Sequence, residues 1–171
     1  MNDEDPQNEQ SFVLRVVENI SEFTADEWNS LVGASRQDAH YNPFITRNFL
    51  LALEESGSVS RKTGWLPRHL RLEDDQGHLI GAVPNYLKGH SQGEYVFDHG
   101  WADAFERTGG RYYPKFQAAV PFTPATGPRL LNHIAYESET VRLALAGGLR
   151  ELADQSGVSS AHVTFALPDE I

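Results

Sequence analysis

The most restrictive feature of the sequence is a strand-like alternation that runs into a cluster of prolines. From residue 116 to residue 122 every second side chain is apolar, as on one face of a β-strand. The overlapping segment VPFTPATGPRLL, residues 120–131, contains three prolines and a glycine. Proline has no N–H group, so this stretch cannot be fully paired in a sheet. We expect either an edge strand ended by prolines or a strand that separates from its neighbour and leaves backbone groups facing a ligand.

Composition indicates one compact domain. The chain has 171 residues, of which 40% are hydrophobic, and this is enough for a single buried core. Cysteine is absent, which excludes a disulfide framework, a thiolate nucleophile and a cysteine-ligated zinc. The 24 acidic residues outnumber the 14 basic ones, and a net charge of −10 disfavours a phosphate-tracking surface. We therefore expect no DNA partner.

The N-terminal residues MNDEDPQNEQ are acidic and polar, unlike a secretory signal. Residues 1–10 have the composition of a disordered leader, and the ordered domain is expected at 11–171. No apolar run approaches the ~20 residues that span a bilayer. These features predict a cytoplasmic protein without a membrane span.

Periodicity and capping signals predict alternating strands and helices. Thr24 and Glu27 form a capping-box pattern, Asn42 precedes a proline at a helix start, and Ser138 is placed to cap a helix that ends at Gly157. The expected elements are a strand at 12–17, a short helix after Thr24, a helix at 42–57, a hairpin with strands near 68–73 and 78–87, a short helix near 101–107, a strand near 112–123, a helix at 138–157 and a strand near 160–167.

This order resembles the first five strands of a GNAT-type acyltransferase domain. Four segments, NPFITRNFLLALEESGS, TGWLPRHL, GAVPNYLKGHSQGEYVFDHGWADA and YYPKFQAAVPFTPATGPRLL, are similar to the N-terminal half of the FemAB-like family of N-acyltransferases associated with peptidoglycan biosynthesis. The resemblance implies an α/β fold with a twisted, mostly antiparallel sheet flanked by helices. Because such proteins are about twice this length, we expect a GNAT-like domain truncated after its fifth strand, without the family's second half.

The resemblance also implies a donor site at the proline segment. GNAT-like folds place the pyrophosphate and pantetheine of coenzyme A where one strand separates from the next, before a helix N-terminus. On this hypothesis Thr123 and Thr126 supply hydroxyl groups, Gly127 allows close backbone approach, and Arg129 supplies a positive charge. Acyl-CoA or aminoacyl-tRNA would be a co-substrate, with no permanently bound cofactor. The alternative is an edge strand with Arg129 on the surface.

A second cluster of polar residues lies in the segment HSQGEYVFDHGWAD, residues 90–103. On a helix His90, Glu94 and Asp98 would share a face, the spacing of a metal site or proton relay. Gly93 and the β-prone residues after it disfavour that helix. As a strand, the segment would place Glu94 and Asp98 on one face, where a carboxylate or His90 could act as general base. The simpler alternative is a solvated loop whose charges pair locally, and no metal is expected.

Two functions remain compatible with these patterns. The first is an N-acyltransferase that uses an amine on a small molecule or cell-wall precursor as acceptor. The second is a non-catalytic substrate-binding or remnant module that needs the missing half. In either case the last strand, near 160–167, is expected to leave an open sheet edge that favours self-association.

Overall fold

The computed structural model describes residues 11–32, 41–96 and 98–170. The leader expected at 1–10 lies outside these ranges. The fold is mixed α/β, with two four-stranded sheets ordered β1-β3-β4-β7 and β2-β5-β6-β8. The strands are β1 Val13–Val17, β2 Trp65–Pro67, β3 His69–Glu73, β4 Leu79–Val83, β5 Asn85–Lys88, β6 Lys115–Ala118, β7 Leu131–Asn132 and β8 Ala161–Val163. The helices are α1 Ala25–Val32, α2 Arg47–Glu55, α3 His99–Arg107 and α4 Ser138–Ser156, with 3-10 turns η1 Ile20–Glu22, η2 Pro43–Ile45, η3 Arg61–Thr63 and η4 Pro168–Glu170.

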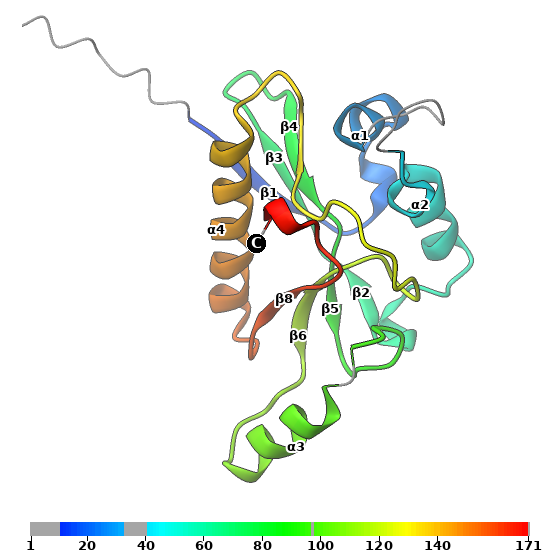
Figure 1. Ribbon diagram of the computed structural model, residues 1–171, viewed down its shortest axis with the longest axis vertical. Helices are drawn as coiled ribbons and strands as arrows, with labels where there is room; N and C mark the ends of the chain where they lie inside the picture. The colour runs from blue at the N-terminus through cyan, green and yellow to red at the C-terminus, as the bar shows by residue number, and fades with distance from the viewer. Residues whose placement is uncertain (1–10, 33–40, 97, 171) are drawn as a thin grey trace, which may run out of the picture.

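One long hairpin joins the two sheets. Pro67 pairs with Tyr86 and Leu70 pairs with Val83 in the same antiparallel register, so β2 continues into β3 and β4 continues into β5. The backbone N–H of Arg68 donates to the carbonyl of Asn85 at 2.8 Å between the two ladders. The expected hairpin is therefore confirmed, and it is longer than predicted. The two sheets are halves of one twisted surface (Figure 1).

The proline segment is a loop inserted between two strands that share a neighbour. β6 pairs Ala118 with Asn85, and β7 pairs Leu131 with Ala82. Between these two pairs the hairpin strand covers three residues, from 85 to 82, whereas the paired chain covers thirteen, from 118 to 131. The proline segment therefore leaves the sheet and returns to it. The loss of pairing is confirmed, but the strand expected near 112–123 covers only 115–118. Phe122 lies in a turn with φ +57°, where extended backbone was expected.

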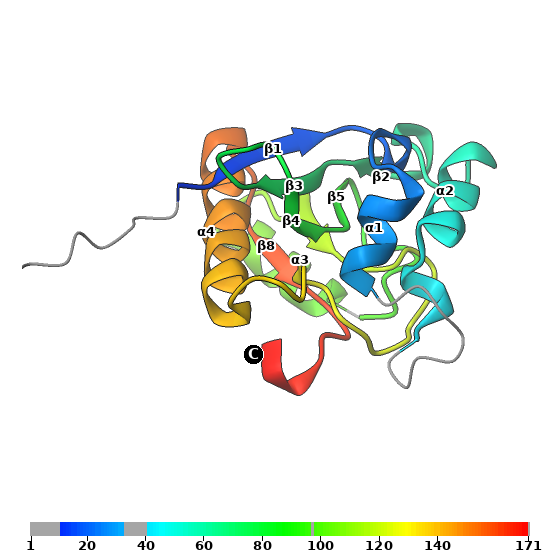
Figure 2. The same ribbon diagram turned by 90° about the horizontal axis from the view of Figure 1, so that it is seen from above.

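Helices cover opposite faces of the strands. α4 lies on one side and α1 and α2 on the other (Figures 1 and 2). The α4 stripe of Val141, Leu145 and Leu149 packs against Leu70 and Ile80. On the other side a second buried cluster contains Phe23, Trp28, Ile45, Leu50 and Leu79. Burial of these apolar side chains stabilises the sheet and holds the loops at its ends.

Two helix starts differ from the sequence prediction. The cap of α4 is Glu137, whose carboxylate accepts from the backbone N–H groups of Glu139 and Thr140, whereas Ser138 is the first helical residue. The helix expected from Asn42 is divided, because Thr46 has an extended backbone and its hydroxyl caps a new helix, α2. The capping box of Thr24 and α1 is confirmed. In the part of the chain that the structure describes, no helix is both long and apolar enough to cross a bilayer.

β8 is the outer strand of its sheet, and it pairs with β6 in parallel. Val163 on this strand is 42% exposed. An open edge of this kind can pair with a second chain. We expect sedimentation at rising protein concentration to show self-association, and Val163→Lys to reduce it because a charge at the edge opposes strand pairing. A monomer at all concentrations would contradict this prediction.

Candidate functional site

One face of the sheet β2-β5-β6-β8 is polar although it is buried. The strand register places side chains in two rows, with Trp65, Lys88 and Lys115 in one and Tyr86, Gln117 and His162 in the other. All of them except His162 are at most 1% exposed. Buried lysines carry a large desolvation cost unless they are paired. This face therefore needs compensating groups from another segment.

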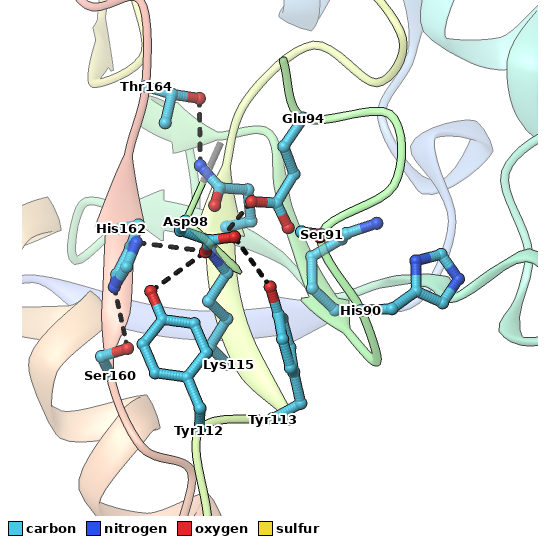
Figure 3. A network of polar contacts seen from close by, with 12 residues as sticks. His90, Ser91, Glu94, Asp98, Tyr112, Tyr113, Lys115, Ser160, His162 and Thr164 are labelled. Atoms are coloured by element: carbon cyan, nitrogen blue, oxygen red, sulfur yellow. Dashed lines mark hydrogen bonds and ion pairs between the residues drawn. The ribbon is translucent and has the colours of Figure 1, made fainter. Parts of the chain in front are cut away.

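Glu94 and Asp98 supply that compensation. The Nζ atom of Lys115 donates to Glu94 Oε2 at 2.9 Å and to Asp98 Oδ2 at 2.6 Å. The hydroxyl groups of Tyr112 and Tyr113 each donate to Asp98 at 3.0 Å. Figure 3 shows the carboxylates and the tyrosines gathered around the lysine. We name Glu94, Asp98, Tyr112, Tyr113 and Lys115 the Lys115 cluster.

The segment that carries the two carboxylates is neither the helix nor the strand considered from the sequence. It is a turn in which Gly93 has φ +80° and Tyr95 has φ +59°, and it ends at Asp98, directly before α3. The turn folds both carboxylates onto the buried face, so they are not in a solvated loop. His90 has no link to the Lys115 cluster in Figure 3, and its Nδ1 atom accepts from the backbone N–H of Gln92. Among the described residues no group of three or more His, Asp or Glu side chains is placed to hold a metal ion.

The two carboxyl groups have opposite pKa shifts. Burial raises the pKa of Glu94, and the hydrogen bond from Lys115 only partly opposes this effect. Burial also acts to raise the pKa of Asp98, but Lys115 and the two tyrosine hydroxyls outweigh it, so that the pKa is lowered. Glu94 Oε1 is buried and has no hydrogen-bond partner among the described residues. Glu94 is therefore the member of the pair that holds a proton more readily than an ordinary glutamate, and Asp98 is the member that holds its charge.

These shifts predict opposite pH profiles for Asp98→Asn and Glu94→Gln. The ordinary pKa of Asp98 is 3.8 and its folded pKa is lower, so its charge stabilises the fold above about pH 4 and that contribution is lost on acidification. The ordinary pKa of Glu94 is 4.5 and its folded pKa is higher, so its contribution is lost as the pH rises.

Asp98→Asn should therefore destabilise the protein most at neutral pH, and Glu94→Gln should gain stability relative to the parent as the pH rises above 4.5. Urea unfolding between pH 3 and pH 8 measures both differences. Parallel profiles for the two variants would contradict the opposite shifts.

The contacts of His162 do not match those of a base that activates a serine. His162 Nδ1 lies 3.5 Å from Lys115 Nζ, and its Nε2 lies 2.9 Å from Ser160 Oγ. A lysine ammonium can only donate, so Nδ1 accepts and Nε2 carries the hydrogen that points at the serine. In this tautomer the imidazole donates to Ser160 and does not accept its proton.

The structure places Arg129 away from the surface. Its side chain is fully buried, which corrects the alternative of a surface arginine. Its guanidinium donates to the backbone carbonyls of Thr164 at 3.0 Å, Pro128 at 3.0 Å and Ala125 at 2.7 Å. Burial lowers its pKa to about 10, so it stays charged at neutral pH. These contacts fasten the proline segment to the end of β8, and a role in phosphate binding stays a prediction.

The other residues assigned to the donor site lie around the same loop but do not converge with the Lys115 cluster. The hydroxyl of Thr123 donates to the carbonyl of Pro121 at 3.1 Å, and Thr126 is exposed. Gly127 is buried and its N–H donates to the carbonyl of Phe165 at 3.0 Å. The loop thus has few free backbone donors near Gly127.

Lys115 is the residue that the sequence reasoning missed. In the segment YYPKFQAA, Lys115 and Gln117 alternate with Phe116 and Ala118, which is the pattern of a strand with one solvent face. The segments that carry Glu94 and Asp98 convert that face into a buried one. The sequence did contain one signal for this cluster. Glu94 and Asp98 shortly precede, along the chain, a predicted strand that contains a lysine.

One of the comparisons with known proteins identifies a family. Residues 19–171 match the profile of the FemAB-like family, described as peptidoglycan biosynthesis/recognition. No protein with a curated description matches the sequence. A crystal structure of a Trypanosoma brucei acetyltransferase is similar with a TM-score of 0.42 and 15% sequence identity, over 90% of this chain and 82% of that chain. At this score the structural likeness carries no argument about activity.

Proposed function

Because the chain belongs to the FemAB-like family of peptidoglycan biosynthesis and recognition, we propose that it is an N-acyltransferase acting on an amine acceptor such as a cell-wall precursor. The donor would be acyl-CoA or aminoacyl-tRNA. In such a reaction the acceptor nitrogen attacks the acyl carbonyl carbon, the bond to the thiol sulfur or the tRNA hydroxyl oxygen breaks, and the amine loses a proton. The protein must position both substrates and accept that proton.

One observation supports Glu94 as the proton acceptor. It is a buried carboxyl group with a raised pKa and one oxygen, Oε1, that has no partner among the described residues. Lys115 holds the other oxygen at 2.9 Å and so fixes the orientation of the carboxyl group. A base is most effective when its pKa is close to the working pH, which burial favours here. Asp98, with a lowered pKa, would keep Lys115 charged and in place.

Replacing Glu94 by glutamine tests this role. We expect turnover to fall by roughly 10²- to 10⁴-fold, because the variant retains the shape of the side chain and loses the base. The assay measures acyl transfer from acetyl-CoA and from aminoacyl-tRNA to an amine-bearing cell-wall precursor, with thermal unfolding as a check of the fold. Glu106→Gln on the exposed part of α3 is the matched control. Equal turnover of parent and Glu94→Gln would remove Glu94 from the mechanism.

A second candidate function is a non-catalytic substrate-binding module. It is favoured by Arg129, whose guanidinium already donates to three backbone carbonyls, two in the proline segment and one at the end of β8. The resemblance places a coenzyme A phosphate at this proline segment. Calorimetry with coenzyme A separates the candidates. Binding that weakens in Gly127→Val supports the donor site, although a β-carbon there would also collide with the side-chain amide of Asn42. Absence of coenzyme A binding, together with binding of the acceptor alone, supports the module.

A further inference from the structure

Lys88 is a buried lysine without a counter-ion. It lies on β5 directly opposite Lys115 of β6, and both residues are 0% exposed. Among the described residues no carboxylate oxygen lies within 4.0 Å of Lys88 Nζ, whereas Lys115 Nζ contacts two of them. A buried ammonium group is costly unless its charge is offset, so its presence on this face calls for a physical reason.

The contacts that hold Lys88 are neutral. Its Nζ atom donates to the backbone carbonyl of Gln92 at 2.9 Å and lies 3.6 Å from the ring centroid of Trp65. An indole face and a carbonyl oxygen both attract a cation, but neither carries a net charge. Gln92 belongs to the turn at 91–96 and precedes Glu94 by two residues. Lys88 therefore fastens this turn to the sheet and keeps a charge that its own contacts do not neutralise.

The two lysines hold the same turn from neighbouring strands. Lys88 binds the backbone at Gln92, and Lys115 binds the side chains of Glu94 and Asp98. Residues directly opposite each other in an antiparallel pair have β-carbons about 5 Å apart. The charge of Lys88 therefore acts at short range on the carboxyl groups that Lys115 binds.

The titratable groups around Lys88 act on it in opposite directions. Burial is the main cause that lowers the pKa of Lys88 from its ordinary 10.5 to about 8, and Lys115 lowers it further, while Glu94 and Asp98 oppose this. Burial raises the pKa of Glu94, and the ammonium groups of Lys115 and Lys88 both act to lower it. His90 faces Lys88 as well, because burial and then the charge of Lys88 lower its pKa. The two tyrosines of the Lys115 cluster face Glu94.

We propose that Lys88 is a positioning residue for Glu94, which favours the ionised form of that carboxyl group through its charge and holds the turn through Gln92. When Glu94 accepts a proton, the negative charge near Lys88 is lost and a buried ammonium group is left without compensation. Release of that proton from Glu94 restores the attraction, so Lys88 favours the return of the carboxylate after each transfer. The inference rests on the proposed function, in which Glu94 takes the proton of the acceptor amine.

NMR titration of the full chain without any substrate tests the coupling. The chain has three lysines, Lys62, Lys88 and Lys115, so isotope-labelled lysine gives few signals. In Glu94→Gln we expect the pKa of Lys88 to fall by about one unit, because a nearby negative charge is lost. In Lys88→Met we expect the pKa of Glu94, followed at its carboxyl carbon, to rise by the same amount. The two shifts must be equal, because both measure one interaction free energy.

Two variants control this titration. Lys62→Met removes an exposed lysine on η3 and should leave the titration of Glu94 unchanged. Lys88→Arg retains the positive charge and should keep the pKa of Glu94 close to that of the parent. If Lys88→Met does not fold, the titration of Lys88 in the parent and in Glu94→Gln decides. Titration of Lys88 at its ordinary pKa of 10.5, or identical titration in both proteins, would overturn the proposal.

The acyl-transfer assay separates a positioning role from a merely structural one. In Lys88→Met the acid limb of the pH profile of kcat should move by about one pH unit to higher pH, with little change in KM, because the base is harder to ionise. Lys88→Arg should restore the limb, and an unshifted limb in Lys88→Met would overturn the positioning role. The NMR titration needs neither donor nor turnover, so the coupling can hold in a protein that transfers nothing. It can also be absent while Glu94→Gln still abolishes transfer, so the two proposals fail separately.

Discussion

Replacing Lys115 by methionine is expected to lower the free energy of unfolding by about 3 to 5 kcal/mol, the cost of breaking a buried ion pair by removing one partner. The side chains of Lys115 and Glu94 are 0% exposed and that of Asp98 is 5% exposed, so water cannot replace the lost ammonium group. Chemical denaturation at neutral pH measures the change. The effect should be smaller at low pH, where the protonated carboxyl groups no longer need a cation.

A triple variant provides the control for this prediction. Lys115→Met combined with Glu94→Gln and Asp98→Asn removes the charges together, and we expect it to recover part of the stability lost by Lys115→Met alone. The contrary result is that Glu94→Gln and Asp98→Asn destabilise the Lys115→Met protein by as much as they destabilise the parent. In that case the three groups are not coupled. That result would contradict the geometry of the cluster.

Replacing Arg129 by methionine is expected to destabilise the protein by at least about 3 kcal/mol, because three carbonyls lose a charged donor in a buried place. The change tests the structural role of this residue against its predicted role in ligand binding. If Arg129 served only to bind a phosphate ligand, its replacement would abolish ligand binding and would change the free energy of unfolding little. Arg142→Met is the matched control, since Arg142 is partly exposed and pairs with Asp169 at 2.9 Å on the surface. Similar small effects of both substitutions would contradict the assignment of Arg129 as the tie between the proline segment and β8.

The same contacts connect the two regions that the sequence singled out. The proline segment is fastened to β8 by Arg129 and to the turn at 91–96 by the hydrogen bond between Phe122 and Gly93. A change in the loop can therefore alter the turn that carries Glu94.

Local chemistry determined much of the fold from the sequence alone. The capping box of Thr24, the hairpin around its Asp-rich turn, the end of α4 at Gly157 and the loss of pairing at the prolines all follow from short-range rules. The family was also evident from four segments, and the profile match over residues 19–171 confirms it. Each of these features depends on residues that are close in the chain.

Tertiary structure alone decided what the polar residues do. The strand pattern placed Lys115 on a solvent face, but Glu94 and Asp98 are buried against it and cover it. Arg129 is enclosed because β7 returns to the hairpin and brings the end of the proline segment under β8. Hydrogen bonds and ion pairs join residues that are distant in the chain. Arg129 and Thr164 are 35 positions apart, and Arg15 and Glu73 are 58 positions apart. No local periodicity encodes such contacts, because they depend on which surfaces meet when the chain closes.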